Sequence, residues 1–549
     1  MLPFYEWDFF SMILIWEDDA VRRMKIKRKF YMDIKRKFRG LWKIIFGRTT
    51  ILIFLLVVQL AALFAGFAIL DNKVIIMNYA LGFLSVVVLI YVVNARQNTS
   101  FKLMWIIFIL AVPVMGVTFY IFTKLQPGSR YISRRINELL IEENKYLIPK
   151  SETVLKIRSE SRRELGLFRY IYEKGNYPVY DNASVRYFPL GDDKYREMVR
   201  QLRDAKEFIF LEYFIIDRGE MWDTILDILV QKAGEGVEVR LMYDGTCTLS
   251  LLPKNYPEQM KKLGIKCRVF SPMMPFLSTH QNNRDHRKIL VIDGRVAFTG
   301  GVNLADEYIN RRERFGHWKD TAIMVKGEAV NSFTIMFLQM WNISEHTRTD
   351  YDKYMRFGHE PDPSMRNGGY IVPYGDSPFD NEEVGKKVYL DIINNSKEYV
   401  DIMTPYLILD EEMTNALVYA AQRGVVVRLI LPHIPDKKYA YLLARTHYAE
   451  LISQGVKIYE YTPGFVHAKV FSSDNEKVVV GTINLDFRSL YLHFECAAYI
   501  WKNPVIDDIN EDFRKTLEKC RQMTLDDCRH YSLVGRILGK ILRFIAPLM

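Results

Sequence analysis

The sequence predicts an α/β protein in which two similar lobes, each with a central β-sheet flanked by helices, follow a set of N-terminal transmembrane helices. Three observations predict this. Apolar strands alternate with amphipathic helices over most of the chain, the pattern of one half returns in the other, and three long uncharged runs precede both. The 549 residues are enough for two lobes, and a formal net charge of +10 favours an anionic partner, either a membrane surface or a nucleic acid.

The first segment, residues 1–48, is strongly basic. Twelve Lys and Arg residues lie between Arg22 and Arg48, with Phe, Tyr and Trp among them. This composition is typical of an amphipathic helix at the surface of an anionic bilayer, although a solvated charged face would have a similar one. The basic residues also favour a cytoplasmic N-terminus.

Three membrane segments are expected over residues 49–123. The runs 51–70, 74–93 and 103–122 each contain twenty residues without a charge, which is long enough to cross a bilayer as a helix. The first run is too long, and starts too late, to be a cleaved signal peptide. The sequence therefore predicts a multi-pass protein of the cell membrane.

The sequence leaves open the side of the membrane on which the lobes lie. Three full spans after a cytoplasmic N-terminus would place them outside the cell. Basic residues directly after the third run favour the cytoplasmic side instead. These residues are Lys124, Arg130, Arg134 and Arg135. If one of the three segments is re-entrant, the topology is reversed.

A helical linker over 124–180 is expected to lead into the two lobes, 181–360 and 361–535. Residues 207–245 and 398–433 share one pattern, which is an apolar strand, an amphipathic helix, a Gly-Val turn and a second apolar strand. Because such units favour parallel strands, each lobe is expected to contain a largely parallel sheet. Two copies are too few for a solenoid, so a pseudo-twofold pair of lobes is predicted.

A short pattern of His and Lys occurs once in each lobe. His286 and Lys288 belong to the first copy, and His467 and Lys469 to the second. Residues two apart in a β-strand lie on one face of the sheet, so each histidine points the same way as its lysine. Such a pair inside an apolar strand is unusual, and its repetition in matching α/β units indicates a function.

Each His-Lys pair is followed by an aspartate and then by a segment that ends in asparagine. Asp293 precedes Gly294 and Asp474 precedes Asn475, between β-patterned runs. These dipeptides are typical of hairpin turns, so the spacing alone indicates that both aspartates shape the turn. Small residues then lead to two amides, which are Asn303 and Asn484.

Two His, two Lys and two Asn side chains that meet across a twofold axis would form a cationic pocket rich in hydrogen-bond donors, which suits a phosphate. A metal site is less favoured. The lysines would repel a divalent cation, and no carboxylate or cysteine lies at ligand spacing beside either histidine. A lone buried histidine is usually structural, but the paired lysines argue against that alternative here.

The chain resembles the phospholipase D superfamily, whose two HKD motifs match His286-Lys288-Asp293 and His467-Lys469-Asp474. It is similar in particular to bacterial cardiolipin synthases over roughly residues 75–549. The segments that carry this similarity include 211–215, 284–308, 315–330, 404–411, 481–495 and the amphipathic basic tail, 536–549. Members of that family carry two hydrophobic segments, so the additional run and the basic extension depart from the family.

The resemblance implies a phosphatidyltransferase that converts two phosphatidylglycerol molecules into cardiolipin and glycerol through a covalent phosphatidyl-histidine. It implies no metal and no other cofactor. The expected partners are phosphatidylglycerol and anionic membrane lipids. No nucleic acid is expected, and a homo-oligomer is left open.

The resemblance also implies roles for individual residues. Both HKD motifs, with Asp293 and Asp474, belong to the catalytic set, and Asn303 and Asn484 bind phosphate together with the lysines. Asp320 and Glu495 are expected to orient the histidines. By analogy His286 is the nucleophile and His467 the general acid and base, although the pseudo-symmetry lets the sequence choose neither.

Several alternatives share the motif. A membrane phospholipase D that hydrolyses lipid and a phosphatidylserine synthase are the nearest ones. A nuclease would suit the basic charge, but much of that charge lies in the N-terminal segment, and the lobes contain no base-stacking motif. A catalytically inactive scaffold is disfavoured by two intact His-Lys pairs.

Overall fold

The computed structural model describes residues 72–124, 127–181, 183–272, 282–345, 349–358, 362–380 and 382–548. The chain divides into two compact units. Of the described residues, one unit contains 72–96 and 105–124, and the other contains 97–104 and everything from 127 onward. The basic segment expected over 1–48 and the apolar run 51–70 lie outside the described residues.

The first unit is helical. The second apolar run forms most of α3 (Asn72–Asn94), whereas the third is divided between α4 (Thr99–Ala111) and α5 (Pro113–Lys124). The break comes at Pro113, whose ring excludes it from a helix interior but suits the start of a new helix. The expectation of one spanning helix over 103–122 is therefore wrong. Among the described helices, none combines the length and the apolar character that a membrane span requires.

The second unit begins with three helices that precede the first sheet. They are α6 (Pro127–Glu143), α7 (Ser151–Glu160) and α8 (Arg162–Gly175). The side chain of Ser161 caps α8 by accepting a hydrogen bond from the N–H of Glu164 at 3.2 Å. Ile136, Leu139, Phe168 and Ile171 bury their side chains against the lobes, so α6 and α8 form part of the core of the second unit.

The first sheet has the strand order β4-β3-β2-β5-β6-β8-β1-β9. Its strands are β1 (Ala183–Phe188), β2 (Phe208–Tyr213), β3 (Glu238–Asp244), β4 (Lys266–Phe270), β5 (Lys288–Ile292), β6 (Val296–Gly300), β8 (Ala322–Gly327) and β9 (Arg366–Asn367). β9 is antiparallel to β1, so the first sheet extends past the boundary expected at 360. The helices of this lobe are α9 (Gly191–Arg203), α10 (Glu220–Gly234), α11 (Tyr256–Lys262) and α12 (Val330–Glu345).

The second sheet has the strand order β10-β17-β16-β15-β11-β12-β13-β18. Its strands are β10 (Tyr370–Asp376), β11 (Tyr399–Met403), β12 (Val426–Pro432), β13 (Lys457–Tyr461), β15 (Val470–Ser473), β16 (Lys477–Gly481), β17 (Glu495–Trp501) and β18 (Cys520–Gln522). Its helices are α13 (Val384–Asn395), α14 (Glu411–Gln422), α15 (Lys438–Ser453), α16 (Phe487–Tyr491), α17 (Val505–Leu517), α18 (Leu525–Arg529) and α19 (Leu533–Ile545).

Seven strands follow the same order in both sheets. In the first sheet this order is β1, β8, β6, β5, β2, β3 and β4, and the corresponding strands of the second are β10, β17, β16, β15, β11, β12 and β13. Only the pairs β2–β3, β3–β4, β11–β12 and β12–β13 are parallel, and the other pairs within these sheets are antiparallel. The expectation of largely parallel sheets is therefore wrong. After β5 and β15 the connections to the next strands are short turns, which permit only antiparallel neighbours.

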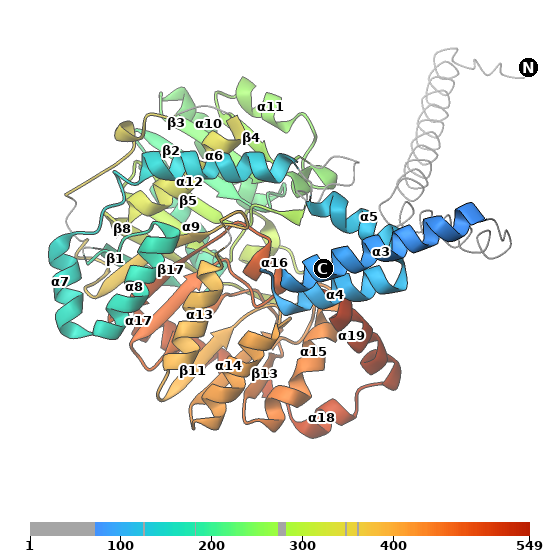
Figure 1. Ribbon diagram of the computed structural model, residues 1–549. Helices are drawn as coiled ribbons and strands as arrows, with labels where there is room; N and C mark the ends of the chain where they lie inside the picture. Colours follow the sequence, from blue (N-terminus) through green and yellow to red (C-terminus); the bar gives the residue numbers. More distant parts are fainter. Residues whose placement is uncertain are drawn as a thin grey trace, which may run out of the picture. The chain divides into compact units, whose positions relative to one another are not determined.

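Helices cover both sheets, and one apolar core joins the lobes. In Figure 1, α10 and α11 lie with β2, β3 and β4 at one end of the unit, and α13 and α14 lie with β11 at the other. Phe210 on β2, Phe337 and Trp341 on α12, and Val470 on β15 belong to a single buried cluster. α12 thus packs between elements of both lobes, which fixes the two sheets as one structural unit.

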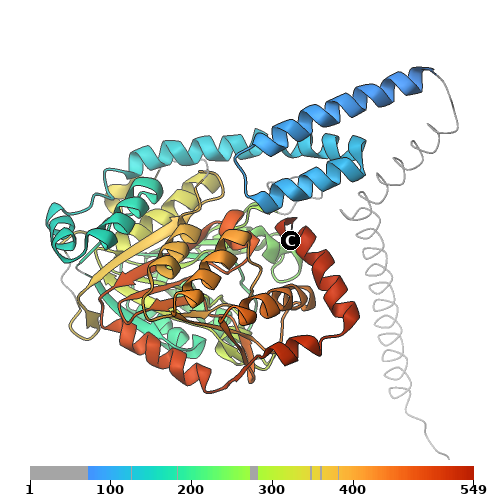
Figure 2. The ribbon, with the colours of Figure 1, turned by 60° about the horizontal axis from the view of Figure 1, so that its bottom comes forward.

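The C-terminal helices lie on the second lobe. α18 and α19 both contact α15, and Figure 2 shows them in dark red along one side of the unit. A short parallel pair, β7 (His317–Lys319) and β14 (Gly464–Val466), links the lobes directly. This pair leads into Asp320 on one strand and His467 on the other.

Candidate active site

The first His-Lys pair lies at the start of β5, where the second lobe meets it. The backbone N–H of His286 donates to the carbonyl of Phe494 at 2.9 Å. Its Nδ1 lies 2.9 Å from Oε1 and 3.0 Å from Oε2 of Glu495, the first residue of β17. Glu495 also accepts a hydrogen bond from the hydroxyl of Thr482. A carboxylate of the second lobe therefore orients the imidazole of the first.

The second pair has the reciprocal arrangement. The backbone N–H of His467 donates to the carbonyl of Lys319 at 2.7 Å, and Nδ1 of His467 lies 2.7 Å from Oδ2 of Asp320. Asp320 belongs to the first lobe. The two histidines therefore occupy equivalent positions. In each case a carboxylate binds Nδ1, and the backbone carbonyl of the residue before that carboxylate binds the backbone N–H of the histidine. A carboxylate on Nδ1 fixes the tautomer and leaves Nε2 free for chemistry.

Tight packing brings the two half-sites together. A Cβ on Gly301 would lie 2.0 Å from Oδ1 of Asp320 and 2.9 Å from the carbonyl oxygen of His467, so only glycine fits there. Across the same junction, the hydroxyl of Thr299 lies 3.4 Å from Sγ of Cys496. The two half-sites therefore lie against each other at the junction of the lobes.

The lysines are buried beside their histidines. Nζ of Lys288 donates to the carbonyl of His286 at 2.5 Å, and Nζ of Lys469 donates to the carbonyl of His467. Burial lowers the pKa of Lys288 to about 8 and that of Lys469 to about 7. Lys288 also contributes to the lowered pKa of Lys469, so the two ammonium groups share one electrostatic environment.

Burial also favours the neutral form of both imidazoles. It lowers the pKa of His467 to about 4, with Lys469 adding to the effect and Asp320 opposing it. It lowers the pKa of His286 well below the ordinary value, against the attraction of Glu495. Burial raises the pKa of Glu495, but the adjacent imidazoles outweigh this, and its net pKa lies below the usual range. Near neutral pH, Glu495 is therefore ionised and both imidazoles are neutral. The lysines keep their ammonium form below their pKa values, which are about 8 for Lys288 and about 7 for Lys469.

The two predicted asparagines differ in their contacts. Oδ1 of Asn303 accepts from the N–H of Ile215 at 3.1 Å, and Nδ2 donates to the hydroxyl of Tyr308 at 2.8 Å. Oδ1 of Asn484 is buried without a hydrogen-bond partner among the described residues. Both polar atoms of Asn303 are thus engaged by the protein, whereas Oδ1 of Asn484 can still accept a hydrogen bond from a donor.

Asp293 and Asp474 lie in the hairpin turns, at the opposite ends of β5 and β15 from the histidines. The carboxylate of Asp293 accepts from the N–H groups of Lys206, Glu207 and Phe208 at 2.7–2.8 Å. That of Asp474 accepts from the corresponding N–H groups, which belong to Lys397, Glu398 and Tyr399. Both carboxylates are therefore occupied in holding the turn to the start of β2 or β11, and the catalytic grouping that the resemblance implied stays a prediction.

Several aromatic residues of the site were not expected from the sequence. The rings of Phe214 and His493 lie 5.0 and 5.6 Å from that of His286, and Tyr308 and Trp318 lie 5.4 and 5.5 Å from that of His467. His493 precedes Glu495 by two residues, a spacing that could have identified it. The ring nitrogens of His286 and His493 and a Glu495 oxygen lie within 4.8 Å of one another, close enough to hold a metal ion.

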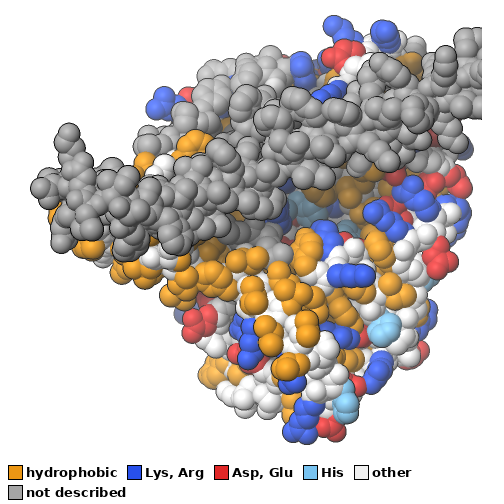
Figure 3. All heavy atoms as spheres, turned by 90° about the vertical axis from the view of Figure 1, so that its right-hand side faces the viewer, with side chains coloured by type: hydrophobic (Ala, Val, Ile, Leu, Met, Phe, Trp, Pro, Cys, Tyr) orange, Lys and Arg blue, Asp and Glu red, His pale blue; other side chains and the backbone are white. Residues whose placement is uncertain are grey.

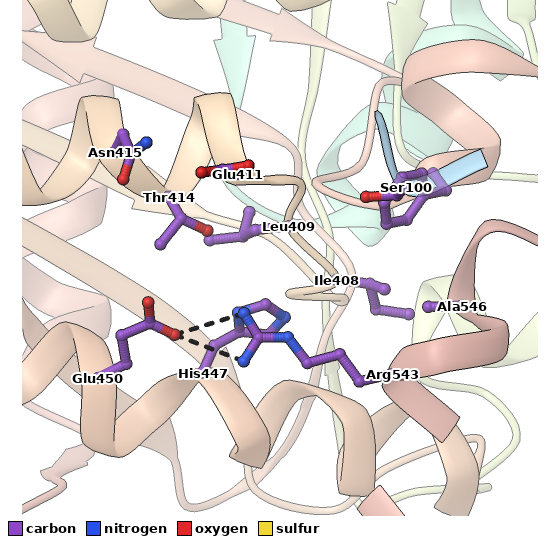
Figure 4. A pocket seen from close by; sticks show the side chains of 11 residues that line it. Ser100, Ile408, Leu409, Glu411, Thr414, Asn415, His447, Glu450, Arg543 and Ala546 are labelled. Atoms are coloured by element: carbon purple, nitrogen blue, oxygen red, sulfur yellow. Dashed lines mark hydrogen bonds and ion pairs between the residues drawn. The ribbon is translucent and has the colours of Figure 1, made fainter. Parts of the chain in front are cut away.

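A separate cavity of about 340 Å³ lies among α14, α15 and α19. Figure 4 shows Glu450 paired with Arg543, at 3.4 Å, beside the buried ring of His447. None of the predicted site residues lines it. The candidate active site is therefore the junction of the two lobes and not this cavity.

Comparison with known proteins relates the chain to lipid enzymes. Residues 198–341 and 389–517 match the family described as "Cardiolipin synthase, PLD-like domain", and residues 83–124 match the one described as "Phospholipase_D-nuclease N-terminal". The chain is 33% identical to a cardiolipin synthase of Alkalihalophilus pseudofirmus over 462 residues, which cover 83% of this chain and 90% of that protein. A cardiolipin synthase of Clostridium perfringens is 34% identical over 460 residues, covering 83% and 95% of the two chains.

A protein of uncharacterised function from Streptococcus mutans is 49% identical over 460 residues, which cover 84% of this chain and 99% of that protein. Among solved structures, the phosphatidylserine synthase of Haemophilus influenzae matches with a TM-score of 0.53 and 14% identity, over 70% of this chain and 98% of that one. At this identity the structural match establishes the fold of the two lobes alone.

Proposed function

Because the chain belongs to the cardiolipin synthase family of the phospholipase D superfamily, we propose that it transfers a phosphatidyl group between two phosphatidylglycerol molecules, giving cardiolipin and glycerol. The observation that carries the proposal is the reciprocal site. Each buried imidazole faces a carboxylate of the other lobe and lies beside a buried lysine. Two such units around one cationic site suit the cleavage and re-formation of a phosphodiester.

In the first step, Nε2 of His286 attacks the phosphorus of one phosphatidylglycerol. The bond from phosphorus to the glycerol oxygen breaks, and the imidazolium of His467 gives its proton to that oxygen. Glu495, bound to Nδ1 of His286, stabilises the positive charge that the imidazole gains on forming the phosphorus–nitrogen bond. The products are glycerol and a phosphatidyl-histidine.

In the second step, the neutral His467 removes the proton from a hydroxyl of a second phosphatidylglycerol. The hydroxyl oxygen attacks phosphorus, the phosphorus–nitrogen bond breaks, and His286 is restored. His467 again becomes the imidazolium paired with Asp320. One proton is thus held by His467 and exchanged with each alcohol in turn, so the cycle is balanced.

The charge state of the site fits these roles. His286 is neutral, as a nucleophile must be, because burial lowers its pKa. His467 is also neutral without substrate, since its pKa lies at about 4. The negative charge of a bound phosphodiester favours the imidazolium, so we infer that substrate binding loads the proton that the first step consumes. Nζ of Lys288, Nζ of Lys469 and Nδ2 of Asn484 are proposed to donate hydrogen bonds to the phosphate oxygens.

We further propose that the enzyme works at the cell membrane as a multi-pass protein. α3 exposes a series of apolar side chains, of which Phe83, Ile90 and Tyr91 are 59–73% exposed. The apolar run 51–70 lies outside the described residues. A site held at the bilayer receives both lipids at high local concentration and excludes water, which favours transfer over hydrolysis.

The amphipathic helix α19 supports a membrane-bound catalytic unit. Its exposed apolar side chains are Leu533, Val534, Ile537, Leu538, Ile541 and Phe544. Arg536, Lys540 and Arg543 are exposed on the same helix. Figure 3 shows apolar and basic side chains mixed over this face of the molecule. A helix with this composition suits the interface of an anionic bilayer.

The role of α19 is tested by vesicle flotation. A double substitution, Ile537→Glu and Ile541→Glu, in a chain that starts at residue 97 and so keeps the whole second unit should reduce binding to phosphatidylglycerol vesicles by roughly tenfold or more. Leu155→Glu, at an exposed apolar position on α7, is the matched control and should bind as the parent does. Equal binding by all three chains would remove α19 from the proposal.

The proposed reaction is tested with purified protein and phosphatidylglycerol as the only lipid. Cardiolipin and free glycerol in equal amounts are the expected products. His286→Ala and His467→Ala should each reduce turnover by at least about 10³-fold. If either variant keeps near-normal turnover, the mechanism with two histidines is wrong.

The same assay separates the alternatives. Phosphatidic acid as the main product would indicate a hydrolase, and phosphatidylserine formed only when serine and a suitable phosphatidyl donor are supplied would indicate a phosphatidylserine synthase. Cleavage of DNA by the wild type but not by His286→Ala would indicate a nuclease. Each of these outcomes would replace the proposed function.

A further inference from the structure

His493 is a buried histidine that the proposed reaction does not use. Its Nδ1 lies 3.7 Å from Oε1 of Glu495, beyond hydrogen-bond length. Neither ring nitrogen has a hydrogen-bond partner among the described residues, although the side chain is only 8% exposed. Because buried polar groups are nearly always paired, an imidazole left in this state next to an ionised carboxylate requires an explanation.

The pseudo-twofold axis shows what is unusual about this position. The carbonyls of Phe494 and Lys319 bind the two active-site histidines, so the residues before them correspond. These are His493 and Trp318, whose rings lie 5.6 and 5.5 Å from their neighbouring imidazoles. An indole offers only an N–H, whereas an imidazole also offers a lone pair. The pseudo-twofold symmetry is thus broken at this position, because the half-site of His286 has a potential metal ligand, His493, where the half-site of His467 has Trp318.

We propose that His286, His493 and Glu495 form a binding site for Zn²⁺ or a similar divalent transition metal, and that the metal inhibits the enzyme. Their ligand atoms all lie within 4.8 Å of one another. Nitrogen and oxygen ligands at about 2.0–2.1 Å in a tetrahedral site lie about 3.3 Å apart. Oε1 of Glu495 lies 2.9 Å from Nδ1 of His286 and 3.7 Å from Nδ1 of His493. One distance is shorter and the other longer than this value.

The donor set is one that zinc proteins use. Two imidazoles and one carboxylate leave a fourth position for water. The sequence argued against a metal because no carboxylate or cysteine lies at ligand spacing beside either histidine. The fold supplies one from a position 209 residues away. Lys288 opposes a divalent cation at this place, so we expect weaker affinity than at a structural zinc site.

Metal binding would block the proposed reaction, on which this part of the inference rests. The metal would occupy the carboxylate that orients His286 and one nitrogen of the imidazole itself. The half-site of His467 cannot bind a metal in the same way, since Trp318 has no lone pair to offer. One metal ion per chain is therefore expected to be sufficient for inhibition.

The binding test uses Co²⁺ with the purified protein and no lipid, because tetrahedral Co²⁺ gives visible absorption bands. The wild type should bind one Co²⁺ with these bands, and Zn²⁺ should displace it. His493→Asn should lose the bands. His433→Asn is the matched control and should keep them. His433 also pairs with a glutamate, Glu460, at 2.9 Å, but among the described residues it belongs to no group that could hold a metal ion.

The activity test follows turnover of phosphatidylglycerol with and without Zn²⁺. Zn²⁺ should inhibit the wild type and His433→Asn, and chelation should restore both. His493→Asn, or His493→Gln if the first variant unfolds, should need at least about tenfold more Zn²⁺ than the wild type to lose half of its own metal-free turnover. Absence of the Co²⁺ bands from the wild type, or their persistence in the His493 variants, would overturn the site. Failure to make cardiolipin would affect the proposed function but not the Co²⁺ result.

Discussion

Orientation of each active-site histidine depends on a residue that the other lobe supplies. Glu495 reaches His286 across 209 positions of sequence, and Asp320 reaches His467 across 147. In both cases the carboxylate accepts from Nδ1–H, so Nε2 keeps its lone pair. This fixes the tautomer that a nucleophile and a general base both need.

Asp320→Asn tests this orientation with almost no change in shape. An amide in place of Oδ2 can donate to Nδ1 of His467, which stabilises the tautomer with the proton on Nε2 and removes the base. We expect turnover of phosphatidylglycerol to fall by roughly two to four orders of magnitude. The thermal unfolding midpoint, measured in parallel, should stay close to the wild-type value. Turnover within about twofold of wild type would contradict the assigned role.

The buried lysines predict how activity depends on pH. Burial lowers the pKa of Lys469 to about 7 and that of Lys288 to about 8, and the ammonium form prevails below each value. As the pH rises through this range the site loses positive charge and binds the phosphodiester less well. We therefore expect kcat/KM for phosphatidylglycerol to fall between about pH 7 and 9.

Bound substrate should shift this decline. The phosphodiester stabilises the ammonium groups, so kcat should fall at a higher pH than kcat/KM does. Lys288→Arg offers a comparison, since a guanidinium stays charged at every pH of the assay and should flatten part of the decline. A kcat/KM that is constant from about pH 7 to 9 would show that these ammonium groups do not bind the substrate.

At the residue scale the sequence predicted the histidines and lysines, because their spacing has meaning within one strand. It could not predict from spacing which carboxylate serves which histidine, since the partners belong to different lobes. His493 was missed because its significance depends on Glu495 facing His286, which is a contact between lobes. Asn303 was expected to bind phosphate, but Tyr308 and Ile215 already engage it.

At the scale of the elements, the β5–β6 and β15–β16 hairpins place the site. Asp293 and Asp474 have φ values of 54° and 55°, in the left-handed region that Asp and Asn tolerate better than most residues. Each carboxylate then accepts three backbone N–H groups at the start of the neighbouring antiparallel strand, which is β2 for Asp293 and β11 for Asp474. Asp293 thereby holds β5 in register with β2, and Asp474 holds β15 in register with β11.

Asp293→Ala tests the hairpin. The variant leaves three N–H groups without their acceptor and puts alanine at a positive φ, so we expect the free energy of unfolding to fall by about 1–3 kcal/mol. Asp293→Asn retains one acceptor oxygen and tolerates the backbone, so its loss should be smaller. Chemical denaturation measures both.

Turnover per folded molecule should be nearly unchanged in both Asp293 variants. A large loss of turnover with an unchanged unfolding midpoint would instead place the aspartate in the catalytic set, as the motif resemblance implied. Asp474→Ala, in the equivalent turn, should behave in the same way and serves as an internal repeat of the experiment.

The strands were easier to predict than the sheets they form. Periodicity identifies an apolar strand, and the Asp-Gly signal identifies the hairpin, but neither states which distant strand pairs with which. The strand–helix–strand units do produce the parallel pairs, such as β2–β3. The remaining strands come from segments without a crossover helix, and their antiparallel pairing depends on the turns that join them.

At the scale of the whole molecule, the duplicated sequence becomes a duplicated sheet, with seven strands in the same order in each lobe. Neither lobe contains a complete site, because its histidine lacks a carboxylate without the other. The buried core that includes Phe210, Trp341 and Val470 runs through both lobes. The functional unit is therefore the pair of lobes within one chain, and a homo-oligomer is not needed to complete the site.

Mixing two inactive variants tests this conclusion. His286→Ala and His467→Ala chains, co-expressed and purified together through different tags, should show only the background turnover of each variant alone. Both histidines of a site come from one chain, so neither variant can supply what the other lacks. If the lobes were exchanged between two chains, one of the two sites in each mixed dimer would be intact. Because about half of randomly formed dimers are mixed, about a quarter of wild-type turnover would return. Co-expression of wild type with His286→Ala provides the control. Whether or not the lobes are exchanged, the turnover of this mixture relative to pure wild type should equal the fraction of wild-type chains in it.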